Sequence, residues 1–133
     1  NIFFLTMDAE GVFPAISRIS GDTVRRFFET GYTSVMPGTE SGVTEIKRTL
    51  SPCYGSPFMP RAVSTYSDML IDKIEQHGSN VFLVNTGMNP ESGERFALDF
   101  TRNTIKQAIL TEYPMRDTSE QVLQTLEQII EGV

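Results

Sequence analysis

The feature that most constrains the fold is an uncharged run of four residues, Val81 to Val84, which is followed by ten residues of mostly turn-forming types. Short runs of β-branched and aromatic residues without charge are typical of a strand buried on both faces of a sheet. Residues 85–94, with the sequence NTGMNPESGE, require the chain to leave the sheet there. A helix is predicted to follow, with Asp99 or Thr101 as its cap and with Ile105, Ala108 and Ile109 on its inner face.

The end of this loop is a candidate ligand site. Open α/β sheets tend to bind ligands where a strand ends in a loop that leads into a helix. Arg95 and Phe96 stand at this point, and a guanidinium beside an aromatic ring can stack on a planar base and hydrogen-bond to it. The alternative is that Arg95 is a solvated loop charge, because most connections of this kind bind nothing.

Length and composition narrow the class of protein. The chain has 133 residues, enough for a single domain with a real core. Its net charge of −6 and pI of about 4.7 argue against a surface for nucleic acid or anionic membrane. No apolar run approaches the roughly 20 residues that cross a bilayer. The chain starts at Asn1 without a signal-peptide pattern, and we interpret it as an excised piece.

The scarcity of cysteine and histidine limits the chemistry. One cysteine, Cys53, excludes an internal disulfide and is typical of a reducing compartment, so we expect a cytoplasmic protein. With His77 as its one histidine, the chain has too few such ligands for an ordinary zinc site. Cys53 is predicted to be a small buried thiol, because no base is evident beside it. A hydrolase that uses Cys53 or Asp8 has no further support in the sequence.

The remaining elements complete the predicted fold. Residues 2–7 are predicted to form a second strand, and Asp8 at its end is either a functional carboxylate or, more commonly, a turn or cap residue. Helices are predicted over residues 22–30, from Pro60 to His77, and from a capping box at 118–121 through Ile130, with an irregular β-rich segment in the middle. This order predicts an α/β (mixed α+β) fold, in which helices flank a mixed sheet.

Three further features are predicted to have no catalytic role. Ser20 is expected to cap the helix at 22–30, whose Arg25 and Arg26 are predicted to lie on a solvated face. The glycine-containing loop at 38–45 lacks the Lys-Ser/Thr ending of a phosphate-binding P-loop and carries two carboxylates, so we reject it as a phosphate site.

Several segments resemble the ATP-dependent phosphoenolpyruvate carboxykinases, in the same order and at nearly the same spacing. The longest, F-L-T-M-D-A-E-G-V-F-P-A-I-S-R-I at residues 4–19, is similar to the family pattern F-L-T-x-D-A-x-G-V-x-P-x-x-S-x-L. The others are F-x-x-G-Y-T at 28–33, G-T-E-S-G-V-T-E at 38–45, C-Y-G at 53–55 with Phe58, and L-V-N-T-G at 83–87. Together they cover roughly residues 3 to 110.

This resemblance implies an enzyme that converts oxaloacetate and ATP into phosphoenolpyruvate, CO2 and ADP in gluconeogenesis, with Mg²⁺ and Mn²⁺. It further implies that the chain is a fragment of the C-terminal, nucleotide-binding lobe, in which Arg95, Phe96 and Thr101 contact adenine and ribose. The family's P-loop, metal ligands and oxaloacetate-binding arginine have no counterpart in these residues. The fragment alone is therefore predicted to be inactive, and its oligomeric state stays open, a monomer included.

The chain also departs from the family pattern. Ser41 replaces an arginine, Phe100 stands where an aspartate is expected, and the loop near Pro90 is about one residue longer. After Leu110 the likeness fades into a short link at 111–117. Ser41 and the altered tail favour an alternative reading, in which a diverged paralogue kept this domain for a non-catalytic structural or interaction role.

Overall fold

The computed structural model describes residues 1–38, 41–111 and 115–132. Thr39 and Glu40 of the G-T-E segment, and residues 112–114 of the link, lie outside them. The strands are β1 (Ile2–Thr6), β2 (Ile16–Ile19), β3 (Tyr32–Val35), β4 (Lys47–Leu50) and β5 (Val81–Asn85). The helices are α1 (Gly21–Thr30), α2 (Val63–His77), α3 (Leu98–Leu110) and α4 (Ser119–Glu131), with short 3-10 turns at Pro52–Tyr54 and Ser56–Phe58.

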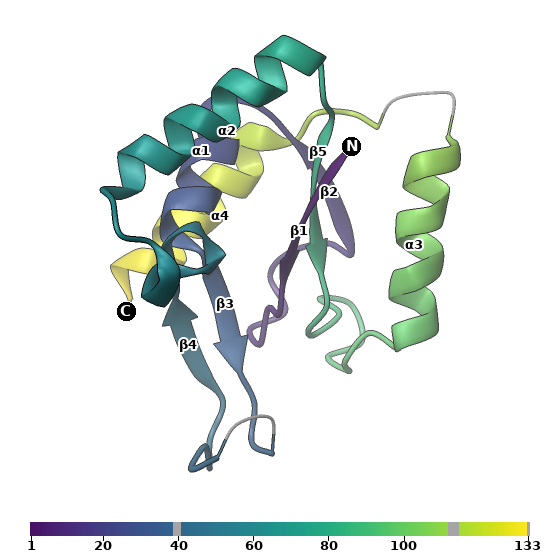
Figure 1. Ribbon diagram of the computed structural model, residues 1–133. Helices are drawn as coiled ribbons and strands as arrows, with labels where there is room; N and C mark the ends of the chain where they lie inside the picture. Colours follow the sequence, from purple (N-terminus) through teal and green to yellow (C-terminus); the bar gives the residue numbers. More distant parts are fainter. Residues whose placement is uncertain (39–40, 112–114, 133) are drawn as a thin grey trace.

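The main sheet has three strands in the order β1-β5-β2 (Figure 1). β5 is parallel to β1 and antiparallel to β2, and all five of its residues are buried. These observations confirm the mixed sheet and the strand buried on both faces. The register pairs Ile2 with Val81 and Thr6 with Asn85, so β1 and β5 end at the same edge of the sheet. β2 was not predicted, because its four residues include Ser17 and Arg18 and follow directly on a loop.

Helices α1, α2 and α4 pack together on one side of the sheet, and α3 stands on the other side (Figure 1). The core between the sheet and these three helices is aromatic at its centre. Phe13 meets Phe27 edge to face at 5.6 Å, and the fully buried Tyr32 lies 6.1 Å from Phe13. β3 and β4 form an antiparallel hairpin, which Thr6 joins to β1 through a 2.7 Å bond from its Oγ1 to the Tyr32 carbonyl.

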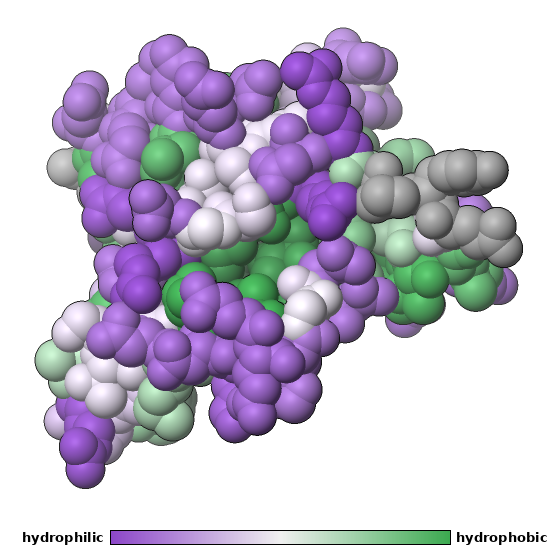
Figure 2. Space-filling model, turned by 90° about the horizontal axis from the view of Figure 1, so that it is seen from above, coloured by the Kyte–Doolittle hydropathy of each residue, from purple (hydrophilic) through white to green (hydrophobic). Residues whose placement is uncertain are grey.

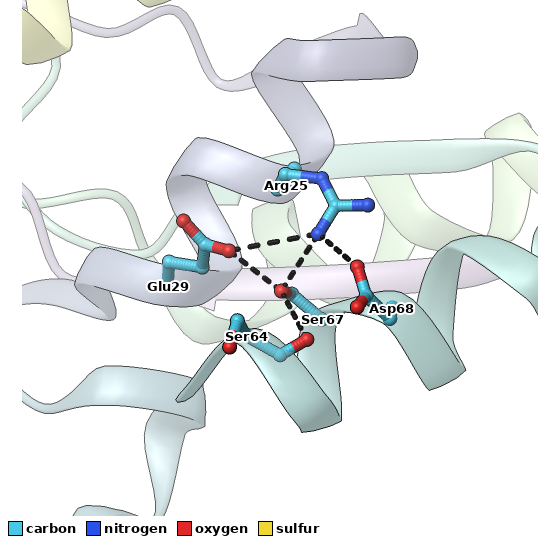
Figure 3. Close-up of polar contacts among 5 residues, drawn as sticks. All are labelled: Arg25, Glu29, Ser64, Ser67 and Asp68. Atoms are coloured by element: carbon cyan, nitrogen blue, oxygen red, sulfur yellow. Dashed lines mark hydrogen bonds and ion pairs between the residues drawn. The ribbon is translucent and has the colours of Figure 1, made fainter. Parts of the chain in front are cut away.

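A polar network joins α1 to α2, which corrects the prediction that Arg25 lies on a solvated face (Figure 3). Arg25 Nη1 donates to Ser67 Oγ at 2.9 Å and to Asp68 Oδ1 at 2.7 Å. Ser67, which is fully buried, also places its Oγ 2.6 Å from Glu29 Oε1. This network could not be predicted from the sequence because its members come from two helices that are far apart in the chain.

Arg26 is paired in the same way, but with α4. Its Nε donates to Glu127 Oε1 at 2.5 Å, and this bond lowers the pKa of the Glu127 carboxyl. The two neighbouring arginines of α1 therefore hold the two helices that flank it.

The predicted helix starts are the least accurate part of the sequence analysis. Ser20 and Thr118 occupy N-cap positions, but neither side chain makes a cap bond. Ser20 Oγ instead donates to Asp117 Oδ2 at 2.5 Å, and the Asp117 Oδ1 accepts the backbone N–H of Ser119. The predicted capping box at 118–121 is thus wrong, because Asp117 supplies the acceptor for the first turn of α4.

Two other starts also differ from the prediction. α2 begins at Val63 rather than at Pro60, after an extended Ala62. α3 begins at Leu98, so Asp99 and Thr101 lie inside the helix and neither caps it. Ile109, predicted to face inward, is 54% exposed because α3 does not pack among the other helices.

Candidate functional site

Asp8 organises the loop that follows β1. Its carboxylate is fully buried and accepts three backbone N–H bonds, from Glu10 at 3.0 Å, Val12 at 2.7 Å and Phe13 at 2.8 Å. Tyr32 Oη donates to the same carboxylate at 3.3 Å. With its oxygens occupied in this way, Asp8 is the turn residue that the commoner of the two interpretations predicted.

Asn85 organises the loop that follows β5, as Asp8 does after β1. Its Nδ2 donates to the carbonyls of Phe13 and Met88, both at 2.9 Å, and its Oδ1 accepts the Gly87 N–H at 2.7 Å. Gly87 then passes so close to Asp8 that a Cβ at this position would lie 2.3 Å from the Asp8 carbonyl oxygen. The loops after β1 and β5 are therefore fixed to each other at the carboxyl edge of the parallel strand pair.

A pocket opens beside these loops, between the end of β5 and the start of α3. It has a volume of 410 Å³ and is lined by Thr86, Arg95, Phe96, Leu98 and Thr101. The three residues that the sequence singled out thus lie around one cavity, whose size falls in the range of about 300–1,000 Å³ typical of small-molecule sites.

The backbone holds Arg95 at the rim of this pocket. Residues Met88 and Arg95 form an antiparallel bridge, and the Phe96 N–H donates to the Gly87 carbonyl at 2.8 Å. Arg95 Nε donates to the Thr86 carbonyl at 3.3 Å, which orients the exposed guanidinium across the mouth. Its Nη groups donate to no residue that the structure describes, so they are available to a ligand.

Thr101 supplies a hydroxyl to the same pocket. The residue is 9% exposed, and its Oγ1 forms no hydrogen bond within the described part of the chain. The nearby Thr104, by contrast, donates its Oγ1 to the Phe100 carbonyl at 2.8 Å, one turn back. The Thr101 hydroxyl is therefore free to donate to or accept from a molecule in the pocket.

Thr86 and Leu98 also line the pocket but were not predicted from the sequence. Thr86 directly follows the buried strand, and this position is the signal that could have found it. Leu98 is 63% exposed at the first position of α3, and nothing in the sequence marks it.

The Cys53 thiol is 6% exposed, and burial, followed by the nearby Glu29 charge, raises its pKa, as suits a small buried thiol. Among residues 1–38, 41–111 and 115–132, no three His, Cys, Asp or Glu side chains are grouped to hold a metal ion. None of the helices in those ranges has the length and hydrophobicity needed to span a membrane.

An α/β domain with a pocket at the carboxyl edge of its parallel strands belongs to a large class of ligand-binding proteins. Comparison with known proteins narrows this class. A family model described as phosphoenolpyruvate carboxykinase matches residues 1–128. The match runs past Leu110, where the motif comparison ended, and so corrects the prediction that the likeness fades there. The chain therefore belongs to the phosphoenolpyruvate carboxykinase family.

The similar relatives are ATP-dependent enzymes. The phosphoenolpyruvate carboxykinases (ATP) of Bacillus mycoides (strain KBAB4), Bacillus cereus (strain AH187) and Bacillus anthracis (strain A0248) are each 45% identical to it over 123 residues. The aligned part is 90% of this chain but 23% of each relative's length. These likenesses do not favour the alternative of a non-catalytic paralogue.

Proposed function

We propose that this chain provides the adenine- and ribose-binding wall of an ATP-dependent phosphoenolpyruvate carboxykinase. That enzyme would act in the cytoplasm and convert oxaloacetate and ATP into phosphoenolpyruvate, CO2 and ADP. In this proposal the chain is one domain of the C-terminal lobe. The observation that carries the proposal is the meeting of Arg95, Phe96 and Thr101 around one pocket at the carboxyl edge of the sheet.

The residues of the pocket suit a base and a sugar. A guanidinium plane and an aromatic ring can both stack on a purine, and a desolvated cation–π contact contributes roughly 0.5 to 2 kcal/mol. The Thr101 hydroxyl and the free Nη groups of Arg95 provide hydrogen-bonding groups with no described partner. The bonds of Asp8 and Asn85 fix the supporting loops in advance, which reduces the ordering cost of binding.

The phosphates and metals belong to other parts of the enzyme in this proposal. Phosphoryl transfer depends on divalent metal ions and cationic groups around the γ-phosphate. The 133 residues contain no P-loop sequence, and the described residues contain no group of metal ligands. The described residues therefore provide no site for the Mg²⁺ and Mn²⁺ of the reaction. The chain by itself should bind nucleotide weakly and should not catalyse its conversion.

The test is a kinetic comparison in the full-length enzyme that carries this segment. Arg95→Ala should raise KM for ATP by about 2- to 30-fold, the equivalent of the lost stacking energy, and leave KM for oxaloacetate unchanged. Arg61→Ala is the matched control, because the exposed Arg61 side chain bonds to no residue that the structure describes, and its backbone N–H, which donates to Tyr66 Oη, remains in the variant. Equal changes in both KM values, or no change in either, would contradict the proposal.

A further inference from the structure

Phe100 makes a close contact with one wall of the pocket. The rings of Phe96 and Phe100 are stacked, with centroids 5.2 Å apart and planes inclined by 7°. Phe96 lines the 410 Å³ pocket, and together with Phe100 it also lines a second cavity of 360 Å³ beside the 89–91 loop. Phe96 thus separates the two cavities, and Phe100 supports it from the side of the second one.

Packing alone does not account for a phenylalanine at this position. Phe100 is 49% exposed in the first turn of α3, where a polar side chain would suit the solvent better. Its one ring contact in the described chain is to Phe96. The terminal torsion of a phenylalanine is broad, so an unsupported ring at the edge of a pocket samples many planes. A parallel stack restricts that ring to one plane.

We propose that Phe100 is a positioning residue of the base-binding pocket: it fixes the plane of Phe96, so that a purine meets an already oriented ring. This inference rests on the proposed function, since it assumes a base in the pocket. The wall of the pocket then has two layers: Phe96 faces the ligand, and Phe100 lies behind Phe96, next to the second cavity. Phe100 itself touches no ligand, because it does not line the 410 Å³ pocket.

The experiment titrates the full-length enzyme that carries this segment with adenosine, a probe that carries base and ribose but no phosphate. Phe100→Leu, which keeps an apolar side chain but removes the ring, should weaken adenosine binding about two- to tenfold, the range of an aromatic pair. Phe100→Tyr, which keeps the ring, should bind as the wild type does. Phe58→Leu is the matched control, because Phe58 is 86% exposed and stacks on no described ring.

A second readout separates positioning from packing. With ¹³C-labelled phenylalanine, the ring signals of Phe96 should shift in Phe100→Leu without any ligand, while the backbone amide signals of α3 stay in place. Unchanged ring signals, or wild-type adenosine binding by Phe100→Leu, would overturn the inference.

Arg95→Ala distinguishes failure of this inference from failure of the proposed function. If Arg95→Ala weakens adenosine binding and Phe100→Leu does not, the role of Phe100 is wrong and the base site stands. If neither variant changes binding, the proposed function and this inference both fail.

Discussion

At the residue scale, Asp8 and Asn85 show how buried polar groups position a pocket without entering it. Both side chains are at most 1% exposed, and each buried group left without a partner would cost about 1 to 3 kcal/mol. Every bond described for them goes to the two loops after β1 and β5 or to Tyr32. They are therefore structural, and a carboxylate at a strand end is not by itself evidence of catalysis.

The close approach of Gly87 to Asp8 gives the first stability prediction. Gly87→Ala should lower the free energy of unfolding by about 3 kcal/mol, since its Cβ would overlap backbone atoms that have no room to move. Gly93→Ala is the control: its φ is +70° and no atom lies within 4 Å, so it should cost only about 1 kcal/mol. Urea unfolding measures both, and equal losses would contradict the contact with Asp8.

Tyr32 gives a prediction for alkaline pH. Burial, and then the charge of Asp8, raises the pKa of its phenol from 10.0 to about 12. A group with a raised pKa in the fold contributes stability that is complete below the unfolded-state pKa and is lost as the pH rises toward the folded-state value. About 2 to 3 kcal/mol should thus be lost between about pH 10 and 12.

Tyr32→Phe removes this titration and should flatten the fall in stability across that pH window. The variant should also lose about 1 kcal/mol near pH 8, with the bond to Asp8. Urea midpoints at several pH values measure the effect, and parallel slopes for Tyr32→Phe and wild type would refute it.

At the element scale, the apolar pattern of the sequence predicted the buried strand and the buried helix face. It could not predict contacts whose partners come from other elements. β5 and the inner face of α4, with Val122, Leu126 and Ile129 buried, were predicted because burial leaves a repeating apolar pattern. The predicted N-caps make no cap bond: Ser20 donates instead to Asp117, 97 residues along the chain, and the first turn of α4 is held by Asp117, just before the predicted capping box. The bonds from Arg25 to Asp68 and from Arg26 to Glu127 were not predicted because these partners lie on other helices.

α3 is the element whose environment the sequence describes least well. Its Leu98, Ile109 and Leu110 are between 54% and 63% exposed, and Figure 2 shows hydrophobic surface on the side of the molecule where α3 lies. A helix with an uncovered apolar face contributes little to the stability of the isolated chain and promotes self-association.

Replacing part of this face should therefore alter solubility more than stability. Ile109→Gln with Leu110→Gln should change the free energy of unfolding by less than about 0.5 kcal/mol, as for surface sites, and reduce light scattering at high concentration. Leu126→Ala, at a fully buried position of α4, should instead cost about 2 to 5 kcal/mol. A large loss from the glutamine pair would mean that α3 is covered by contacts that its exposure does not reveal.

At the scale of the whole molecule, the part of the site that could be predicted is the part whose residues are close together in the sequence. Arg95, Phe96 and Thr101 lie within seven residues of sequence, so the loop and helix after one strand bring them together. The supports of the pocket come from farther away, because Asp8 and Asn85 meet only once β1 and β5 pair. Phe100 is an intermediate case. Its position four residues after Phe96 can be read from the sequence, but the stacking of the two rings cannot.

The division between base binding and phosphate binding yields the last prediction. A chain with a net charge of −6 and no P-loop has no means of holding three phosphates, whereas its pocket suits an adenine and a ribose. The 133-residue chain should therefore bind adenosine and ATP with affinities within about tenfold of each other, and tripolyphosphate should displace neither. NMR titration should place the shifts near Arg95 and Thr101 rather than in the 38–45 loop. ATP binding about 100-fold tighter than adenosine binding and displaced by tripolyphosphate would contradict this, because the free energy would then come from a phosphate site within the chain.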